Sequence, residues 1–169
     1  YLTERLRKRK LVDSLKLKID GTNISDDGLL SLSKIFTKES SLQNLELRML
    51  FADKIRDKGV VELASNLSKL PKLKELKLSL GGYNSTLTEK SLIALGEHLP
   101  KISNLSCLEL ELLDLKNLND KGIILLLKNM GNLKKLKDFY LSLHSFNLKK
   151  VIGDVTLINL AKLFTSVDL

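Results

Sequence analysis

The sequence predicts an α/β solenoid, in which short parallel strands form one sheet and short helices form a layer beside it. Leucine supplies 42 of the 169 residues and aromatic residues only 5%, which is typical of one apolar position repeated many times. A short pattern of alternating apolar residues occurs five times, at intervals of 31 or 32 residues. After each copy the apolar spacing changes from two residues to three or four, so each interval predicts a strand and then a helix.

The five expected strands share the pattern Leu-x-x-Leu-x-Leu, with Phe139 in place of the second leucine in the last copy. Each pattern continues with one more apolar residue two positions further on. Alternation of this kind predicts a short strand with one buried face. The copies begin at Leu11, Leu42, Leu73, Leu105 and Leu136.

A second segment follows each strand after a variable gap and predicts a short amphipathic helix. The apolar residues of this segment are spaced three and four apart, which gives a helix one apolar stripe. In the first copy the stripe consists of Leu29, Leu32, Ile35 and Phe36. Each segment opens near an acidic residue, and these are Asp26, Asp57, Glu89, Asp120 and Asp154.

The recurring acids have two interpretations. An acid at a helix start stabilises the helix by capping it and through the helix dipole, and this is the role that we expect. Paired catalytic carboxylates or calcium ligands are the alternative. Acids of neighbouring repeats should lie about 10 Å apart, the width of a helix, so nothing would draw two of them together.

The alternating unit resembles a leucine-rich repeat, and the strand with its helix is similar to the ribonuclease-inhibitor-like subtype. The resemblance covers roughly residues 11–164. It implies a curved horseshoe segment with strands on the concave side and helices on the convex side, because strands stack ~4.8 Å apart while helices need ~10 Å. The repeats are longer than the usual ~20–29 residues. The family's asparagine after the strand is replaced by Asp20, Leu50, Gly81, Leu113 and His144.

We expect residues 1–169 to form a single domain of about five repeats that belongs to a longer chain. Neither end has the polar cap that a repeat stack needs, so further repeats or a partner should cover both ends. No run of 18 apolar residues occurs, so no transmembrane helix is expected. The single cysteine, Cys107, excludes an internal disulfide and favours a reducing compartment.

No motif for catalysis or for cofactor binding occurs, so we expect a non-enzymatic protein with no cofactor, no metal and no small-molecule substrate. His98 and His144 lie in different repeats, without a cluster of metal-ligand spacing. Cys107 has no histidine base nearby. The pair Gly81-Gly82 lacks the following lysine and serine or threonine of a phosphate-binding loop.

The polar residues between the strand leucines should point to the concave face, because side chains alternate across a strand. These residues form three rows, which are basic at the N-terminal end and acidic at the C-terminal end. Such polarity favours a protein partner of opposite polarity over a polyanion, although a solvated surface without a ligand is the alternative. The candidate partner-binding residues are Lys16, Lys18, Glu46, Arg48, Lys77, Glu109, Glu111 and Tyr140.

The net charge of +8 is concentrated at the N-terminus, since residues 1–18 hold seven basic and two acidic side chains. This segment could bind RNA, an acidic protein tail or an anionic membrane by charge alone. Nucleic acid is the weaker case, because only Tyr1 offers an aromatic platform for a base. The alternative is a lysine-rich outer helix face. The candidate residues for polyanion binding are Arg5, Arg7, Lys8, Arg9 and Lys10.

Three apolar residues of the strand-to-helix turns, Leu50, Phe51 and Leu113, are further contact candidates. Exposed apolar residues on loops are unfavourable unless they turn inward or a partner covers them.

Together these features predict a protein-interaction scaffold in a multi-subunit, intracellular and cytoplasmic assembly, for which a ciliary or cytoskeletal setting is one candidate. The concave sheet and the strand-to-helix loops would be its recognition surface. One alternative is a GTPase regulator, which similarity to other proteins with such repeats suggests. A polyanion-binding module centred on residues 5–18 is a second. The third is a receptor for a kinase or a ubiquitin ligase, with the other domain outside these residues.

Overall fold

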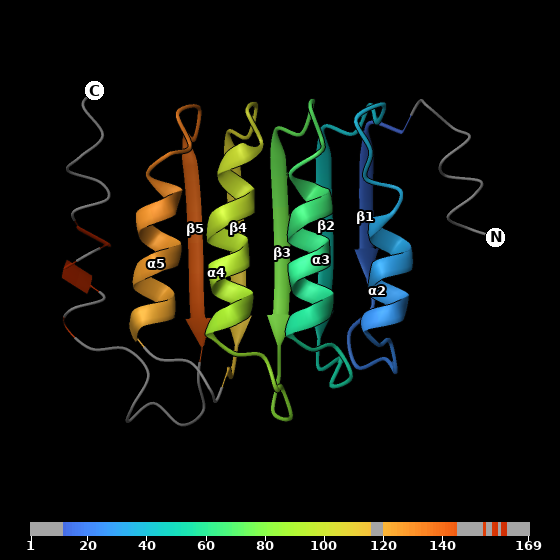
Figure 1. Cartoon of the computed structure of the whole chain (residues 1–169), viewed down its shortest axis with the longest axis vertical. Helices are drawn as coiled ribbons and strands as arrows, with labels where there is room; N and C mark the ends of the chain where they lie inside the picture. The colour runs from blue at the N-terminus through green and yellow to red at the C-terminus, as the bar shows by residue number, and fades with distance from the viewer. Residues whose placement is uncertain (1–11, 116–119, 145–153, 155–156, 159, 162–169) are drawn as a thin grey trace.

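The computed structural model describes residues 12–115, 120–144, 154, 157–158 and 160–161. Five parallel strands form one open sheet in chain order, and helices α2 to α5 lie in a layer over one face of it (Figure 1). The strands are β1 (Ser14–Lys18), β2 (Asn44–Leu50), β3 (Glu75–Gly81), β4 (Cys107–Leu113) and β5 (Asp138–His144). The helices are α2 (Asp26–Ser33), α3 (Asp57–Leu67), α4 (Glu89–His98) and α5 (Asp120–Met130).

The predicted leucine-rich-repeat architecture of parallel strands and one helix layer is therefore confirmed. Each strand falls on a predicted alternating segment, and each helix begins at its predicted acidic residue. The helix predicted from Asp154 lies largely outside the described residues, as do the expected continuations at both ends of the chain.

The register of the sheet places equivalent residues of successive repeats side by side. Leu45 pairs with Leu76, and Leu76 pairs with Leu108. The strands are also linked where they begin, because the carbonyl of Lys74 accepts hydrogen bonds from the N–H groups of Ser106 and Cys107, at 2.8 and 3.0 Å. Each strand therefore enters the sheet in the same way as the strand before it.

The hydrophobic core lies between the sheet and the helix layer. The strand leucines Leu47, Leu78 and Leu110 have no exposed surface, and neither do Leu63 and Leu95 on the helices. A repeat of this size cannot bury its apolar face alone, so each repeat depends on its neighbours for stability.

Helices α2 and α4 end before the last apolar residue that their sequence segments bury. Helix α2 ends at Ser33, yet Phe36 remains buried, because a turn in which its N–H donates to the Ser33 carbonyl brings it back to the core. Helix α4 gives way to the 3₁₀ helix η1 (Leu99–Lys101) at Pro100, which cannot donate the next helical hydrogen bond.

Strands β1 to β4 are each followed by a residue with positive φ at the same repeat position. These residues are Gly21 (64°), Phe51 (59°), Gly82 (143°) and Asp114 (46°). Their N–H groups donate to the carbonyl that ends the next strand, for example from Phe51 to Gly81 at 2.7 Å and from Gly82 to Leu113 at 2.8 Å. The backbone ladder of the sheet thus continues into the turns.

Candidate protein-interaction surface

The face of the sheet that carries no helix presents the three predicted rows of polar residues, and we call it the open face. The rows are Ser14, Asn44, Glu75, Cys107 and Asp138; then Lys16, Glu46, Lys77, Glu109 and Tyr140; then Lys18, Arg48, Ser79, Glu111 and Ser142. The structure therefore brings together all eight candidate partner-binding residues. Tyr140 is 58% exposed, so its ring is open to solvent.

Opposite charges alternate along the middle row and form ion pairs between neighbouring strands. Lys16 Nζ lies 2.6 Å from a Glu46 oxygen, and Lys18 Nζ lies 3.6 Å from the other. Lys77 Nζ lies 3.1 Å from Glu109 and 3.6 Å from Glu75. The hydrogen bond from Lys16 is the main cause that lowers the pKa of Glu46, and the bond to Glu109 is the main cause that raises the pKa of Lys77.

Asp20 is a functional neighbour of this surface that the sequence did not single out as a site residue. Its Oδ2 accepts a 2.6 Å hydrogen bond from Arg48 Nε, and its Oδ1 accepts from the Leu50 N–H at 2.9 Å. Asp20 thus satisfies a backbone group in the turn at the position where the leucine-rich-repeat asparagine is expected. The sequence signal for this role is the position of Asp20 in the repeat, where the family's asparagine is expected.

These contacts change the predicted charge polarity of the open face. At the N-terminal end three cations, Lys16, Lys18 and Arg48, face the carboxylates of Glu46 and Asp20, which leaves one positive charge. The open-face residues of β4 and β5 include three carboxylates and no cation, and they are Cys107, Glu109, Glu111, Asp138, Tyr140 and Ser142. The basic end is therefore nearly neutralised, whereas the acidic end keeps an excess of carboxylates although Glu109 pairs with Lys77 and Glu111 lies 3.9 Å from Arg48.

The strand-to-helix turns expose an aromatic pair. Phe51 is 36% exposed and stacks on Tyr83 of the next turn, with ring centroids 5.4 Å apart and an interplanar angle of 30°. Gly82 makes this approach feasible, since a Cβ there would lie 2.8 Å from Phe51 Cδ1 and 2.9 Å from its Cα. The expectation that Leu50 and Leu113 are exposed contacts is wrong, because both turn inward and are buried.

Asp26 and Asp57 do not occupy the N-cap positions of their helices as expected, although both lie in the first turn, where the helix dipole favours an acid. The N-cap positions of α2, α3 and α4 are Ser25, Arg56 and Thr88, and among these only the Thr88 side chain accepts a hydrogen bond from its own helix. The acids are the first helical residues, and two of them reach the next repeat. Asp26 Oδ1 accepts from the Arg56 N–H at 2.8 Å, and Asp57 accepts from Thr88 and Ser91.

Neighbouring helix starts also lie closer together than the expected helix width. A Cβ on Gly59 would lie 3.2 Å from Asp26 Cα, and one on Gly122 would lie 3.3 Å from Glu89 Cα. Glycine at the third helical position therefore lets the starts of α3 and α5 pack directly against the preceding helix, whereas α4 has Ser91 at this position. Asp26 and Asp57 both lie within reach of the next repeat's backbone.

The remaining candidates for chemistry lie apart from one another. Among the described residues, no group of three or more His, Cys, Asp or Glu side chains is arranged to hold a metal ion. Cys107 is half-buried on the open face, and burial is the main cause that raises its thiol pKa, followed by the charges of Glu75 and Asp138. Such a thiol is a poor nucleophile.

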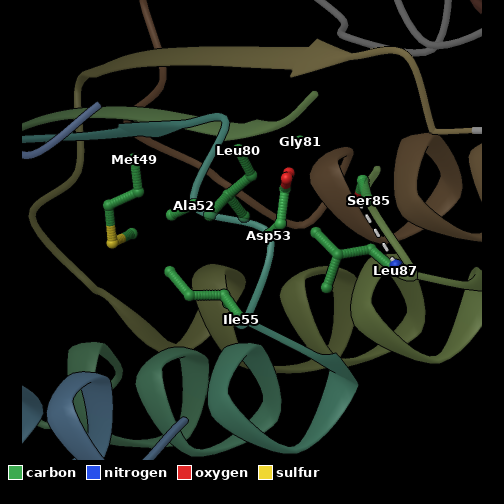
Figure 2. Close-up of a pocket in the computed structure, with 8 residues that line it drawn as sticks. All are labelled: Met49, Ala52, Asp53, Ile55, Leu80, Gly81, Ser85 and Leu87. Carbon is green, nitrogen blue, oxygen red and sulfur yellow. Dashed lines mark hydrogen bonds between the residues drawn. The ribbon is translucent and has the colours of Figure 1, made fainter. Parts of the chain in front are cut away.

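A small hollow lies under the turns that follow β2 and β3 (Figure 2). Apolar side chains, among them Met49, Ile55, Leu80 and Leu87, form most of its wall, with Asp53 and Ser85 on the same side as the turns. Its space of about 10 Å³ holds about one water molecule, so it is too small for a substrate.

The basic candidates Arg5, Arg7, Lys8, Arg9 and Lys10 lie outside the described residues. Within the described part of the chain, no helix has both the length and the apolar character needed to cross a membrane.

Comparison with known proteins supports the fold. No protein-family model matches the sequence, and no curated protein matches it at a significant level. Solved structures do match: the actin-binding site 2 domain of leiomodin-1 has a TM-score of 0.67 at 13% identity, covering 96% of this chain and 85% of that one. The C-terminal domain of tropomodulin from Caenorhabditis elegans has a TM-score of 0.63 at 15% identity, covering 96% and 89%. The chain thus shares its open parallel sheet and single helix layer with these two domains.

Proposed function

We propose that the chain is a non-enzymatic protein-binding module that acts in a larger intracellular assembly. The observation that carries the proposal is the stacked pair of Phe51 and Tyr83, two exposed aromatic side chains held together on adjacent strand-to-helix turns. Aromatic residues are enriched in protein interfaces and often dominate their binding energy.

The turn that carries Phe51 supports an interaction role. A phenylalanine at φ 59° is unfavourable by roughly 1–2 kcal/mol relative to an ordinary conformation, and glycine stands at the equivalent position of two other repeats. A residue other than glycine in such a strained conformation is typical of functional sites. The backbone hydrogen bond of Phe51 to Gly81 fixes the turn, so binding would require little ordering.

The open face adds a broad second surface to the same module. Its side chains already form ion pairs in the free protein, and a sheet with fixed register keeps the rows in place. We assign the repeats to the ribonuclease-inhibitor-like subtype, because a regular helix follows each of the strands β1 to β4. A cytoskeletal setting fits this proposal best.

Actin is the first partner to test, because the leiomodin-1 domain with a similar fold is an actin-binding site. The full chain should sediment with actin filaments or bind monomeric actin, and a variant with Phe51→Asn and Tyr83→Ala should bind at least tenfold more weakly. Leu157→Ala is the matched control, since Leu157 is an exposed apolar residue of another repeat. Equal binding by the double variant and the control would exclude the aromatic pair as the contact.

The wider proposal has its own test, which does not depend on actin. A photoreactive phenylalanine analogue in place of Tyr83 should cross-link the protein to a defined partner in its native cells. The same analogue at Lys72, which is exposed before β3, serves as the control position. Failure of the analogue at position 83 to cross-link any protein above the control would contradict the scaffold function.

A further inference from the structure

We propose that the acidic half of the open face binds a lysine- or arginine-rich segment of the partner protein. We call this half the β4–β5 patch, and it consists of Glu109, Glu111, Asp138 and Tyr140. The inference rests on the proposed protein-binding function and specifies the chemistry of the partner at this surface.

The register of the two strands places three carboxylate residues near Tyr140. Tyr140 is the direct partner of Glu109 on the neighbouring strand, and Glu111 is opposite Ser142. Neighbouring strands lie ~4.8 Å apart and residues of one face follow every ~6.6 Å along a strand, so three carboxylates are close to the tyrosine. A cation that stacks on the exposed ring, within ~6 Å of its centre, would also be within reach of these carboxylates.

Within the described part of the chain, two cations compensate the charge of this patch only in part. Lys77 divides its ion pairs between Glu109 and Glu75, at 3.1 and 3.6 Å. Arg48 forms its short contact with Asp20, at 2.6 Å, and reaches Glu111 only at 3.9 Å. The patch therefore keeps a negative field that a basic partner would neutralise.

Cys107 lies on β4 among the same carboxylates. Its thiol lies in the row between Glu75 and Asp138, and burial followed by these two charges raises its pKa. The thiol therefore lies beside the patch, where it can be used as a chemical probe of the patch.

The overall charge of the protein makes binding of a basic probe informative. The chain carries a net charge of +8, much of it in residues 1–18, so its overall charge does not attract a cationic peptide. Attraction of such a peptide would consequently have to come from a local acidic region. A polyanion would be attracted to the chain as a whole and repelled by the β4–β5 patch.

The test uses the full chain and a fluorescent octapeptide in which arginine alternates with glycine, with fluorescence anisotropy as the readout. A matched peptide with citrulline in place of arginine has nearly the same shape and no charge. We expect only the arginine peptide to bind, with an affinity that falls as salt is raised from about 50 to 300 mM because the charges are partly exposed.

Variants of the patch locate the binding. The double change Glu111→Gln with Asp138→Asn should weaken binding about tenfold, and Tyr140→Leu about threefold, whereas Tyr140→Phe keeps the ring and should bind nearly as well as the wild type. Glu62→Gln on α3 is the matched control, because Glu62 is an exposed acid on the helix side of the molecule. Its affinity should stay within about twofold of the wild type.

Alkylation of the single cysteine gives a second readout at the patch itself. The arginine peptide should slow the reaction of Cys107 with iodoacetamide, and the citrulline peptide should leave the rate unchanged. Equal binding of both peptides, or an unchanged affinity in the double variant, would overturn the inference. If cross-links at position 83 capture a partner while the arginine peptide does not bind, this inference is wrong and the proposed function stands.

Discussion

Asp57 and Ser91 are joined across neighbouring repeats by a hydrogen bond of 2.6 Å from the Ser91 hydroxyl to Asp57 Oδ1. The same carboxylate accepts from the N–H and the hydroxyl of Thr88, at 2.9 and 2.7 Å. The first residue of α3 therefore completes the hydrogen bonding at the start of α4. A group that usually serves its own helix here links one repeat to the next.

Removal of this link should destabilise the protein. Asp57→Ala leaves the N–H of Thr88 and two hydroxyl groups without their acceptor, so we expect a loss of about 1–3 kcal/mol in the free energy of unfolding. Asp27→Ala is the matched control, because Asp27 is the next acid in the first turn of α2 and is exposed. Urea denaturation measures both, and an equal loss in the two variants would show that the carboxylate of Asp57 has no special role.

The stabilisation by Asp57 should depend on pH. Burial raises the pKa of its carboxyl group, but the hydrogen bonds from Ser91 and Thr88 together outweigh burial and leave the pKa below its ordinary value of 3.8. The contribution is therefore complete above about pH 4 and is lost as the pH falls through the lowered pKa of the folded state. The difference in unfolding free energy between the wild type and Asp57→Asn should shrink below pH 4, and a constant difference down to pH 2 would contradict this assignment.

Gly59 should be intolerant of a larger side chain. In Gly59→Ala the new Cβ would lie within contact of the Asp26 carboxylate and 3.2 Å from the Asp26 backbone, which cannot move away easily. We expect the substitution to destabilise the protein by about 1–3 kcal/mol, despite the better helix propensity of alanine. Gly28→Ala at the same position of α2 meets only a flexible Ile24 methyl group at 3.3 Å, and it should be neutral or slightly stabilising. Thermal unfolding of the two variants compares them directly.

Core leucines should matter far more for stability than the ion pairs of the open face. Leu78 is completely buried, so Leu78→Ala should reduce the free energy of unfolding by about 2–5 kcal/mol. Its neighbour Lys77 has a side chain that is 40% exposed, and Lys77→Gln should reduce it by less than about 1 kcal/mol. Guanidinium denaturation would contradict this ranking if the lysine variant lost as much as the leucine variant.

The turn at Phe51 should favour glycine over alanine. Phe51→Gly and Phe51→Ala both remove the ring and its stacking on Tyr83, but only alanine keeps a Cβ at φ 59°. The glycine variant should be the more stable by about 1 kcal/mol. The same pair of substitutions at Glu62, in the middle of α3, should give the opposite order by a similar amount. If the glycine and alanine variants have the same order of stability at both positions, the backbone of Phe51 is not constrained in this way.

The fold could be predicted because the leucine spacing carries its information locally. The change from period two to period three and four marks each strand and helix, and the constant interval sets a register in which Leu45, Leu76 and Leu108 meet. The same register predicted the three polar rows, because alternation across a strand leaves no other place for them.

Contacts between side chains of different repeats could not be predicted in the same way. The carboxylate of Asp26 reaches the Arg56 N–H where Gly59 lets the start of α3 approach that of α2, and this distance is not encoded in the pattern of either repeat. Burial of Leu50 and Leu113 similarly depends on the direction that the chain takes after each strand. Of the three apolar turn residues, only Phe51 is exposed.

The hydrogen bonds that link successive repeats also determine how the protein would respond to mechanical load. Each of these bonds connects a repeat only to the next one, as from the Arg56 N–H to the Asp26 carboxylate and from the Phe51 N–H to the Gly81 carbonyl. A force that pulls β1 away from β5, across the strands, would load one interface at a time, so repeats should detach successively at low force. A force along the strands would load all the bonds of an interface together and should meet much greater resistance.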